Sequence, residues 1–147
     1  MGKKTKRRYR MCVDYKATLN KHIQSDAYPL PIVEEIFSRI GNAKIFAKVD
    51  LKSAYCQIDL DSQSRGLSVI NTAKALYTLN RLQMGLKNAS AIFQRCKETI
   101  LKGISGVIIN QDDVLICGAE SDNQLKKRIK AVTTRLRERN VTISAEK

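Results

Sequence analysis

Three aspartates stand where a carboxylate is chemically costly. Asp50 interrupts the apolar end of Lys-Val-Asp-Leu, and the pair Asp112-Asp113 separates the apolar runs 107–109 and 114–116. A carboxylate near a core is destabilising unless a cation or hydrogen bonds compensate it. Adjacent carboxylates repel each other, and ligand sets made only of oxygen favour Mg²⁺ or Mn²⁺ over zinc. If the three meet in space, they could hold two metal ions about 3.5–4 Å apart for in-line phosphoryl transfer.

A simpler explanation of the pair is a solvated Asp-Asp turn, because aspartate suits turns. The charge of the chain argues in the other direction. Lys and Arg number 27 and Asp and Glu 14, so the net charge is 27 − 14 = +13. Such an excess attracts polyanions, of which nucleic acid is the commonest, although anionic membrane surfaces and ribosomal RNA are competing partners.

The elements that must position these residues predict an α+β fold. Apolar alternation predicts strands, and apolar residues at helical spacing predict helices. A hairpin is expected around the Asp pair, because two apolar runs flank a polar turn. Together the elements indicate an antiparallel sheet covered by two or three helices on one face. The expected strands cover residues 10–15, 45–51, 58–60, 67–72, 76–82, 107–109 and 114–116, with a last one from Val141; the expected helices run from Pro31 to Ile40, from Ala89 to Leu101 and onward from Ser121.

Other site classes are disfavoured. The four cysteines, at positions 12, 56, 96 and 117, form no C-x-x-C pair, and His22 is the one histidine, which argues against a zinc site or a redox motif. Free thiols suit a reducing compartment, so we expect an intracellular protein of the cytoplasm or nucleus. No apolar run approaches the ~18 residues of a membrane span, and no signal peptide is visible, so no membrane partner is expected.

Five segments, in order, resemble the reverse transcriptases of gypsy-type long-terminal-repeat retrotransposons. They are Arg10–Lys16 with Leu19-Asn20-Lys21, Asp26–Pro31, Asp50–Ile58, Asn80–Gln94, and the Gln111-Asp112-Asp113 hairpin with Val114 to Ile116. The resemblance runs from about Arg10 to the C-terminus. It implies a polymerase palm-type sheet with part of the fingers. We expect a basic N-terminal arm at residues 1–9 and a truncated fingers and palm at 10–147, without a thumb or an RNase H domain.

The resemblance also implies roles for individual residues. Asp50, Asp112 and Asp113 would be catalytic and would bind Mg²⁺ or Mn²⁺. The backbone at Leu51 and the side chain of Arg10 would approach a deoxynucleoside triphosphate. The Tyr55 ring would lie under the sugar and exclude a 2′-hydroxyl, and Gln94 would shape the pocket or contact the template. Contacts with an RNA/DNA template-primer would come from Lys87, Arg95, Asn110 and Gln111, and other chains of the retroelement polyprotein are expected as further partners.

Ordinary explanations exist for several of these residues. Tyr55 could simply pack in the core, Arg10 could be one more charge of the basic arm, and the seven-charge helix face after Ser121 could be solvated. The chain also departs from the family at three positions. Asn110 replaces an aromatic residue of the hairpin, and Gln83 and Ser90 replace prolines, which indicates relaxed constraint.

Two functions therefore compete. The first is an RNA-directed DNA polymerase domain fragment acting by two-metal nucleotidyl transfer, weak or inactive as a lone chain. The second is a catalytically dead remnant that binds RNA or DNA through Lys and Arg. An unrelated basic interaction protein and a chain that does not fold stably are further alternatives, and the ordered motifs argue against the former.

Overall fold

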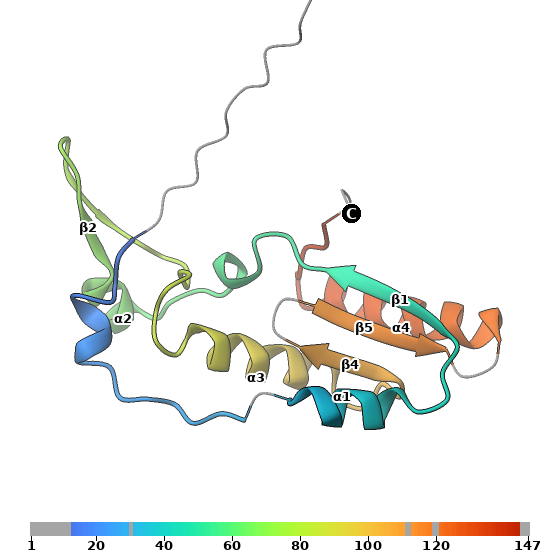
Figure 1. Ribbon diagram of the computed structural model, residues 1–147. Coiled ribbons are helices and arrows are strands. Elements are labelled where there is room, and N and C mark those ends of the chain that lie inside the picture. Colours follow the sequence, from blue (N-terminus) through green and yellow to red (C-terminus); the bar gives the residue numbers. More distant parts are fainter. Residues whose placement is uncertain (1–12, 30, 111–112, 119–120, 145–147) are drawn as a thin grey trace, which may run out of the picture.

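The computed structural model describes residues 13–29, 31–110, 113–118 and 121–144 (Figure 1). Arg10, Gln111 and Asp112 lie outside these ranges, as does the expected basic arm. The elements follow one another as η1 (Leu19–Lys21), α1 (Val33–Ile40), β1 (Ile45–Asp50), η2 (Ala54–Gln57), α2 (Ser62–Leu67), β2 (Val69–Asn71), β3 (Leu76–Thr78), α3 (Ala89–Leu101), β4 (Val107–Asn110), β5 (Asp113–Gly118) and α4 (Asp122–Glu138).

The central sheet is antiparallel, with the strand order β1-β5-β4. Its two faces differ because side chains alternate along a strand. On one face Val114 and Ile116 of β5 are fully buried, and Ala47 and Val49 of β1 pack against the same core. Lys48, Asp50 and Asp113 belong to the other face. The apolar alternation of β1 and β5 therefore decides which face the carboxylates occupy.

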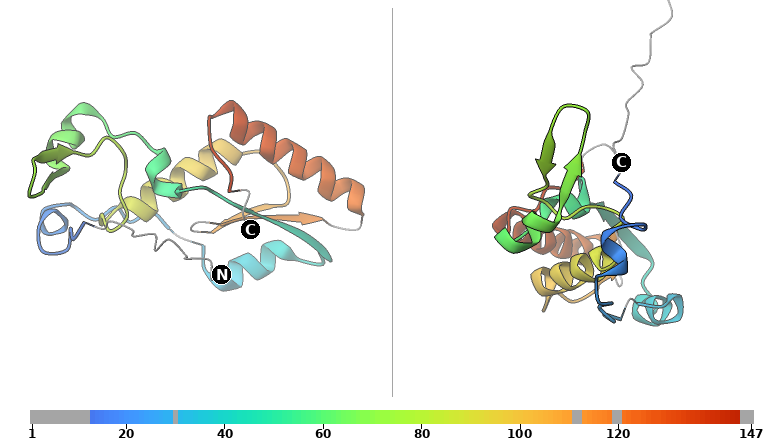
Figure 2. Two further views of the ribbon diagram at one scale, coloured as in Figure 1. Left: turned by 90° about the horizontal axis from the view of Figure 1, so that it is seen from above. Right: turned by 90° about the vertical axis from the view of Figure 1, so that its left-hand side faces the viewer.

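Helices α3 and α4 cover the apolar face. Phe93 and Leu101 of α3 are buried in the same cluster as Val132 and Leu136 of α4. Seen from above, α4 and α1 lie on opposite sides of the sheet (Figure 2). Helix α1 is close to β4, but none of its residues is buried. The expected α+β fold with an antiparallel sheet is confirmed; α3 and α4 cover one face of the sheet, and α1 lies on the other side.

The turn before β4 depends on a glycine. Gly106 has φ +71°, a conformation that residues with a side chain rarely adopt. The guanidinium of Arg128 from α4 occupies the place that a Cβ of residue 106 would take, and it donates a hydrogen bond to the Cys117 carbonyl. This contact joins α4 to the end of the β4–β5 pair that lies away from Asp113.

The segment between β1 and α3 differs most from the sequence prediction. Asp61 caps α2 by accepting hydrogen bonds from the N–H groups of Gln63 and Ser64. Because this helix continues to Leu67, the strand expected at 67–72 starts only at Val69. The strand expected at 76–82 ends at Thr78, and that at 58–60 is a single bridge between Asp59 and Arg81. The small β2–β3 hairpin and α2 form a separate lobe beyond the N-terminal end of α3 (Figure 1).

Both chain ends also differ from expectation. Val13 to Tyr15 are not a strand, and α1 begins at Val33 with Ile32 as its N-cap rather than at Pro31. The strand expected from Val141 is reduced to one bridge between Ile143 and Leu51. Cys56, Cys96 and Cys117 are free thiols. In the described ranges no helix is both long and apolar enough to cross a membrane.

Candidate metal and nucleic-acid site

Asp50 and Asp113 are direct cross-strand partners. Asp50 is the last residue of β1, Asp113 is the first of β5, and the register pairs them with each other. The Cβ atoms of such partners lie about 4.5–5.5 Å apart, close enough for both carboxylates to share one cation. The sheet therefore brings together two of the three predicted ligands, and the third, Asp112, lies outside the described residues.

Lys48 is a site residue that the sequence interpretation missed. Its Nζ lies 2.8 Å from Oδ2 of Asp113, and the two side chains are 58% and 46% exposed. Like charges directly opposite in a sheet destabilise it, so the ammonium offsets the repulsion between Asp50 and Asp113. The sequence did contain a signal for Lys48. It stands two residues before Asp50 in the same strand, and side chains two residues apart in a strand lie on the same face of the sheet.

The donor set fits a hard divalent cation. Asp50 and Asp113 offer oxygen ligands on one face of the sheet, the kind that Mg²⁺ and Mn²⁺ prefer. Within the described part of the chain, no three His, Cys, Asp or Glu side chains form a possible metal cluster. A complete set would need Asp112 and release of the Lys48 ammonium from Asp113.

Tyr55 lies between the predicted site and the core. Its ring centroid is 5.1 Å from that of Phe93, and its hydroxyl is 3.3 Å from Oγ of Ser90. The neighbouring Leu51 is 5% exposed, so its side chain faces the core and only its backbone is available to a ligand. Ser90 thus contacts the residue that is predicted to lie under the sugar. The nucleotide-binding roles of Leu51 and Tyr55 stay predictions.

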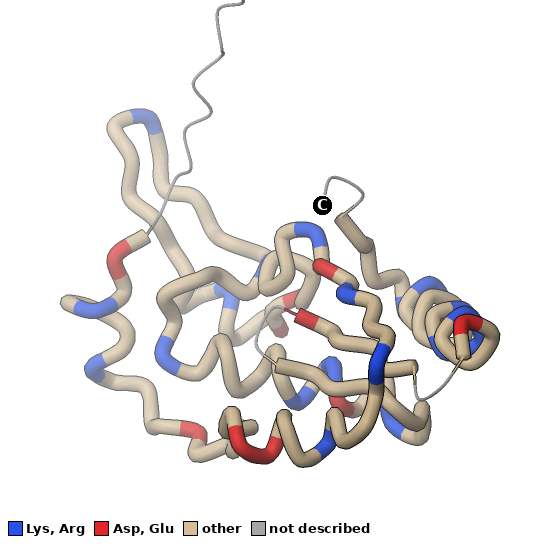
Figure 3. The backbone as a smooth tube through the Cα atoms, turned by 45° about the vertical axis from the view of Figure 1, so that its right-hand side comes forward, with Lys and Arg blue, Asp and Glu red and all other residues tan. Residues whose placement is uncertain are grey.

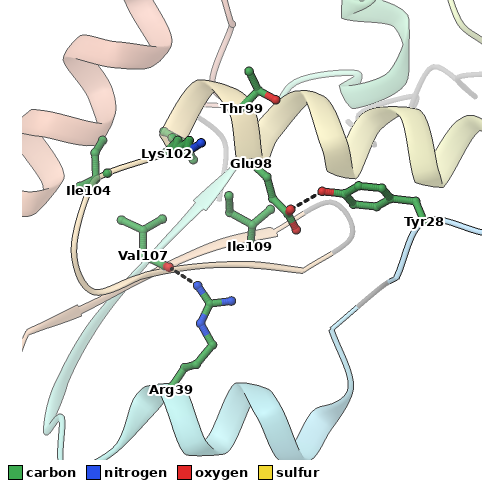
Figure 4. Close-up of a pocket in the computed structure, with 10 residues that line it drawn as sticks. Tyr28, Arg39, Glu98, Thr99, Lys102, Ile104, Val107 and Ile109 are labelled. Atoms are coloured by element: carbon green, nitrogen blue, oxygen red, sulfur yellow. Dashed lines mark hydrogen bonds between the residues drawn. The ribbon is translucent and has the colours of Figure 1, made fainter.

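Gln94 supports the hairpin from the helix side. It is 1% exposed, and its Nε2 donates to the Ile109 carbonyl at 3.1 Å and to Oε1 of Glu98 at 2.7 Å. The Tyr28 hydroxyl donates a hydrogen bond to the other oxygen of Glu98 (Figure 4). That bond is the main reason why the pKa of Tyr28 is raised, with burial adding to it. Sequence reasoning placed Gln94 in the site but missed Tyr28 and Glu98.

A pocket of about 470 Å³ lies beside this network, at the outer edge of β4. Arg39 of α1 closes one side by donating to the Val107 carbonyl at 3.3 Å (Figure 4). The outward carbonyls of Val107 and Ile109 are therefore both bound by side chains, Arg39 and Gln94. Such capping protects an edge strand from pairing with another chain.

Lys87 and Arg95, which we predicted to contact nucleic acid, make contacts inside the chain. Nζ of Lys87 donates to the Ile23 carbonyl at 3.0 Å. The guanidinium of Arg95 lies 2.7 Å from Asp26 and stacks over the Tyr28 ring, 4.8 Å from its centroid. Both cations thus fasten the segment before α1 to the start of α3. Their role in binding nucleic acid stays a prediction.

Asn110 ends β4 directly opposite Asp113, which suits a residue next to the metal site. Gln111 and Arg10 are not among the described residues. Basic residues recur in the sequence of α4, which carries several of the Lys and Arg positions marked in Figure 3. Two of them serve the fold, since Arg128 binds the Cys117 carbonyl and Arg135 donates to the Ile100 carbonyl at 3.1 Å.

Comparison with known proteins gives consistent matches. A family model described as reverse transcriptase (RNA-dependent DNA polymerase) matches residues 1–147. The chain is 34% identical over 144 residues to the retrovirus-related Pol polyprotein from transposon 412 of Drosophila melanogaster, covering 97% of this chain and 12% of that protein. It is 35% identical over 140 residues to the polyprotein from transposon gypsy of the same organism, covering 94% and 13%. It thus spans about an eighth of these relatives.

Among solved structures, the fold is similar to the foamy viral protease-reverse transcriptase in complex with an RNA/DNA hybrid. The TM-score is 0.85 at 22% sequence identity, and the match covers 94% of this chain and 19% of that one. At this identity the likeness establishes the fold.

Proposed function

The chain belongs to the reverse transcriptase family, and from that premise we propose that it carries the metal-binding centre of an RNA-directed DNA polymerase. Its relatives are Pol polyproteins of long-terminal-repeat retrotransposons, gypsy included, so the resemblance drawn from the sequence is confirmed. The chain corresponds to a segment of those polyproteins. Polymerisation, its substrates and its partners form the proposal.

The observation that carries the proposal is the register of Asp50 with Asp113 on the face of the sheet opposite the apolar core. With Asp112 these side chains would hold Mg²⁺ or Mn²⁺. When bound, two such ions stabilise the attacking and leaving oxygens of an in-line displacement. The primer 3′-hydroxyl would attack the α-phosphorus of a deoxynucleoside triphosphate, forming the new phosphodiester bond and releasing pyrophosphate.

The other side chains would bind and select the substrate. Arg10 and the Leu51 backbone would approach the triphosphate, and the Tyr55 ring would exclude a 2′-hydroxyl. Lys87, Arg95, Asn110 and Gln111 would contact the template-primer, and Gln94 would support the hairpin that carries two of the ligands. The foamy viral neighbour was solved with an RNA/DNA hybrid, which supports a template-primer as the partner here.

Primer extension on an RNA template with Mg²⁺ tests this proposal. We expect feeble extension by the natural sequence and none by the Asp112→Asn/Asp113→Asn double variant. An Asp122→Asn/Glu138→Gln variant, with the same change of charge on α4, is the matched control. Equal extension by the natural sequence and the Asp112/Asp113 variant would exclude the assigned ligands.

A second function is favoured by the Lys48–Asp113 ion pair, because an ammonium already neutralises one of the carboxylates. The chain would then be a catalytically dead remnant that binds RNA or DNA through its +13 charge. This alternative predicts that RNA affinity is unchanged in the Asp112/Asp113 variant and falls at least about tenfold between low and moderate salt. Salt-independent binding would exclude it.

A further inference from the structure

The last described residues lie antiparallel beside the end of β1. Leu51 forms a bridge with Ile143, the Lys52 N–H donates to the Thr142 carbonyl at 3.0 Å, and the Ser144 N–H donates to the Asp50 carbonyl at 2.9 Å. Val141 and Ile143 pack against the core on either side of the exposed Thr142. Residues 141–144 therefore lie beside the end of β1 (Figure 1), where their backbone bonds that of Asp50 and Lys52.

One side chain joins these two segments. Nε2 of Gln57 donates to the Lys52 carbonyl at 2.6 Å and to the Thr142 carbonyl at 3.0 Å, and its Oε1 accepts from the Thr142 N–H at 2.7 Å. Both ends of the amide are thus bonded to backbone. Gln57 and Thr142 are 85 residues apart in the sequence, so the contact closes a long-range connection.

The chemistry of this position requires a primary amide. Two carbonyl oxygens need donors and one N–H needs an acceptor, and among side chains of this length only glutamine supplies both. A glutamate keeps the acceptor, loses both donors and places negative charge against two carbonyls. The local fold provides the reach, because Ser53 at φ 50° turns the chain after β1 and Gln57 ends the 3-10 turn of η2.

We propose that Gln57 is a positioning residue for the metal-binding end of β1. By fastening Thr142 to Lys52 it holds residues 141–144 against the Asp50–Lys52 backbone and so fixes the direction of the Asp50 carboxylate. Gln57 acts through Asp50 and does not itself touch metal or substrate. This inference rests on the proposed function, since it assigns Gln57 to the same site.

The test uses the full chain and three variants. Gln57→Glu removes the donors, and Gln57→Leu removes all polar contacts at similar size. Gln63→Glu is the matched control, because Gln63 is exposed on α2 and only its backbone contacts Asp61. Amide hydrogen exchange is measured at Lys52 and Ser144 and, for comparison, at Val114 and Ile116. Mn²⁺ affinity and the thermal melt of each variant are measured in parallel.

For both Gln57 variants we expect about tenfold faster exchange at Lys52 and Ser144, with Val114, Ile116 and the melt little changed. Mn²⁺ affinity should fall severalfold, and Gln63→Glu should match the natural sequence. Unchanged exchange at Lys52 and Ser144 would refute the fastening, and faster exchange with unchanged Mn²⁺ affinity would refute the positioning role. If the natural sequence binds no Mn²⁺, the proposed function fails and the positioning role with it, while the exchange data still decide the fastening. A variant that loses its cooperative melt would show a general structural role and contradict the proposal.

Discussion

The predicted site has two sides that are stabilised in different ways. On the β1 side, Asp50 ends an outer strand that is fastened to residues 141–144 by backbone bonds and Gln57. On the hairpin side, Asp113 begins β5, whose Val114 and Ile116 are fully buried and whose partner strand β4 is bound by Gln94. Each side thus depends on one glutamine amide that binds backbone, but Gln94 is 1% exposed whereas Gln57 is only half-buried.

The two sides of the site should therefore respond differently when a stabilising contact is removed. The hairpin side is part of the core, so disturbing it should weaken the whole fold. The β1 side is a backbone connection near solvent, so disturbing it should open only the end of the strand. A bound cation shared by the two sides would add a direct link between them, which makes metal affinity a sensitive measure of how well each side is positioned.

The largest effect is expected at Gln94. Gln94→Leu leaves the buried Ile109 carbonyl without its donor, which costs about 1–3 kcal/mol, and it takes one donor from the half-buried Glu98. Denaturant unfolding should show this loss, while Gln57→Leu should lose clearly less. Gln63→Leu on the surface of α2 is the control. Equal losses at positions 57 and 94 would contradict the division into a core side and a peripheral side.

A smaller effect is expected at Lys48. There the substitution should raise the affinity for metal, whereas the Gln57 variants should lower it. Lys48→Met removes the ammonium that occupies Oδ2 of Asp113. Two unit charges about 4 Å apart in water interact by about 1 kcal/mol, so removing an ammonium beside a divalent cation should raise Mn²⁺ affinity at least about fivefold. Stability should change by no more than about 1 kcal/mol, because the pair is exposed. Lys44→Met makes the same change of charge outside the site and should leave the affinity unaltered, and a fall in affinity at Lys48→Met would show that Lys48 orients Asp113 for the metal.

The hairpin side was largely predictable from the sequence. The apolar runs of β4 and β5 flank a short polar turn, and α3 has the expected bounds Ala89–Leu101, because strong local patterns decide these elements. The register that places Asp50 opposite Asp113 could not be derived, since it depends on how two strands distant in the chain pair. The family resemblance implied that the three aspartates lie together, and the register shows that Asp50 and Asp113 are direct cross-strand partners.

The β1 side shows where local patterns fail. Gln57 is not part of a periodic pattern of apolar residues, and its partner Thr142 lies 85 residues away. Nothing near Gln57 in the sequence therefore indicates its contacts. Helix α2 was missed because six residues that include Gly66 show no helical apolar spacing, although Asp61 at its start was a usable capping signal. Lys48 had a signal in its shared face with Asp50, but the ion pair follows only from the register.

The smallest expected effect concerns Tyr28 and tests how far the hairpin side extends. The hydrogen bond to Glu98 raises the pKa of Tyr28 above its ordinary value of 10.0. Because the folded value lies above the unfolded one, this contact contributes fully to stability below the ordinary value and is lost as pH rises through the folded one. As pH rises above about 10, the natural sequence should therefore lose slightly more thermal stability than Tyr28→Phe, which has no hydroxyl to titrate. Tyr77→Phe, on the exposed β2–β3 hairpin, should keep the natural dependence. Identical curves for Tyr28→Phe and the natural sequence would mean that the network supporting the hairpin ends at Glu98.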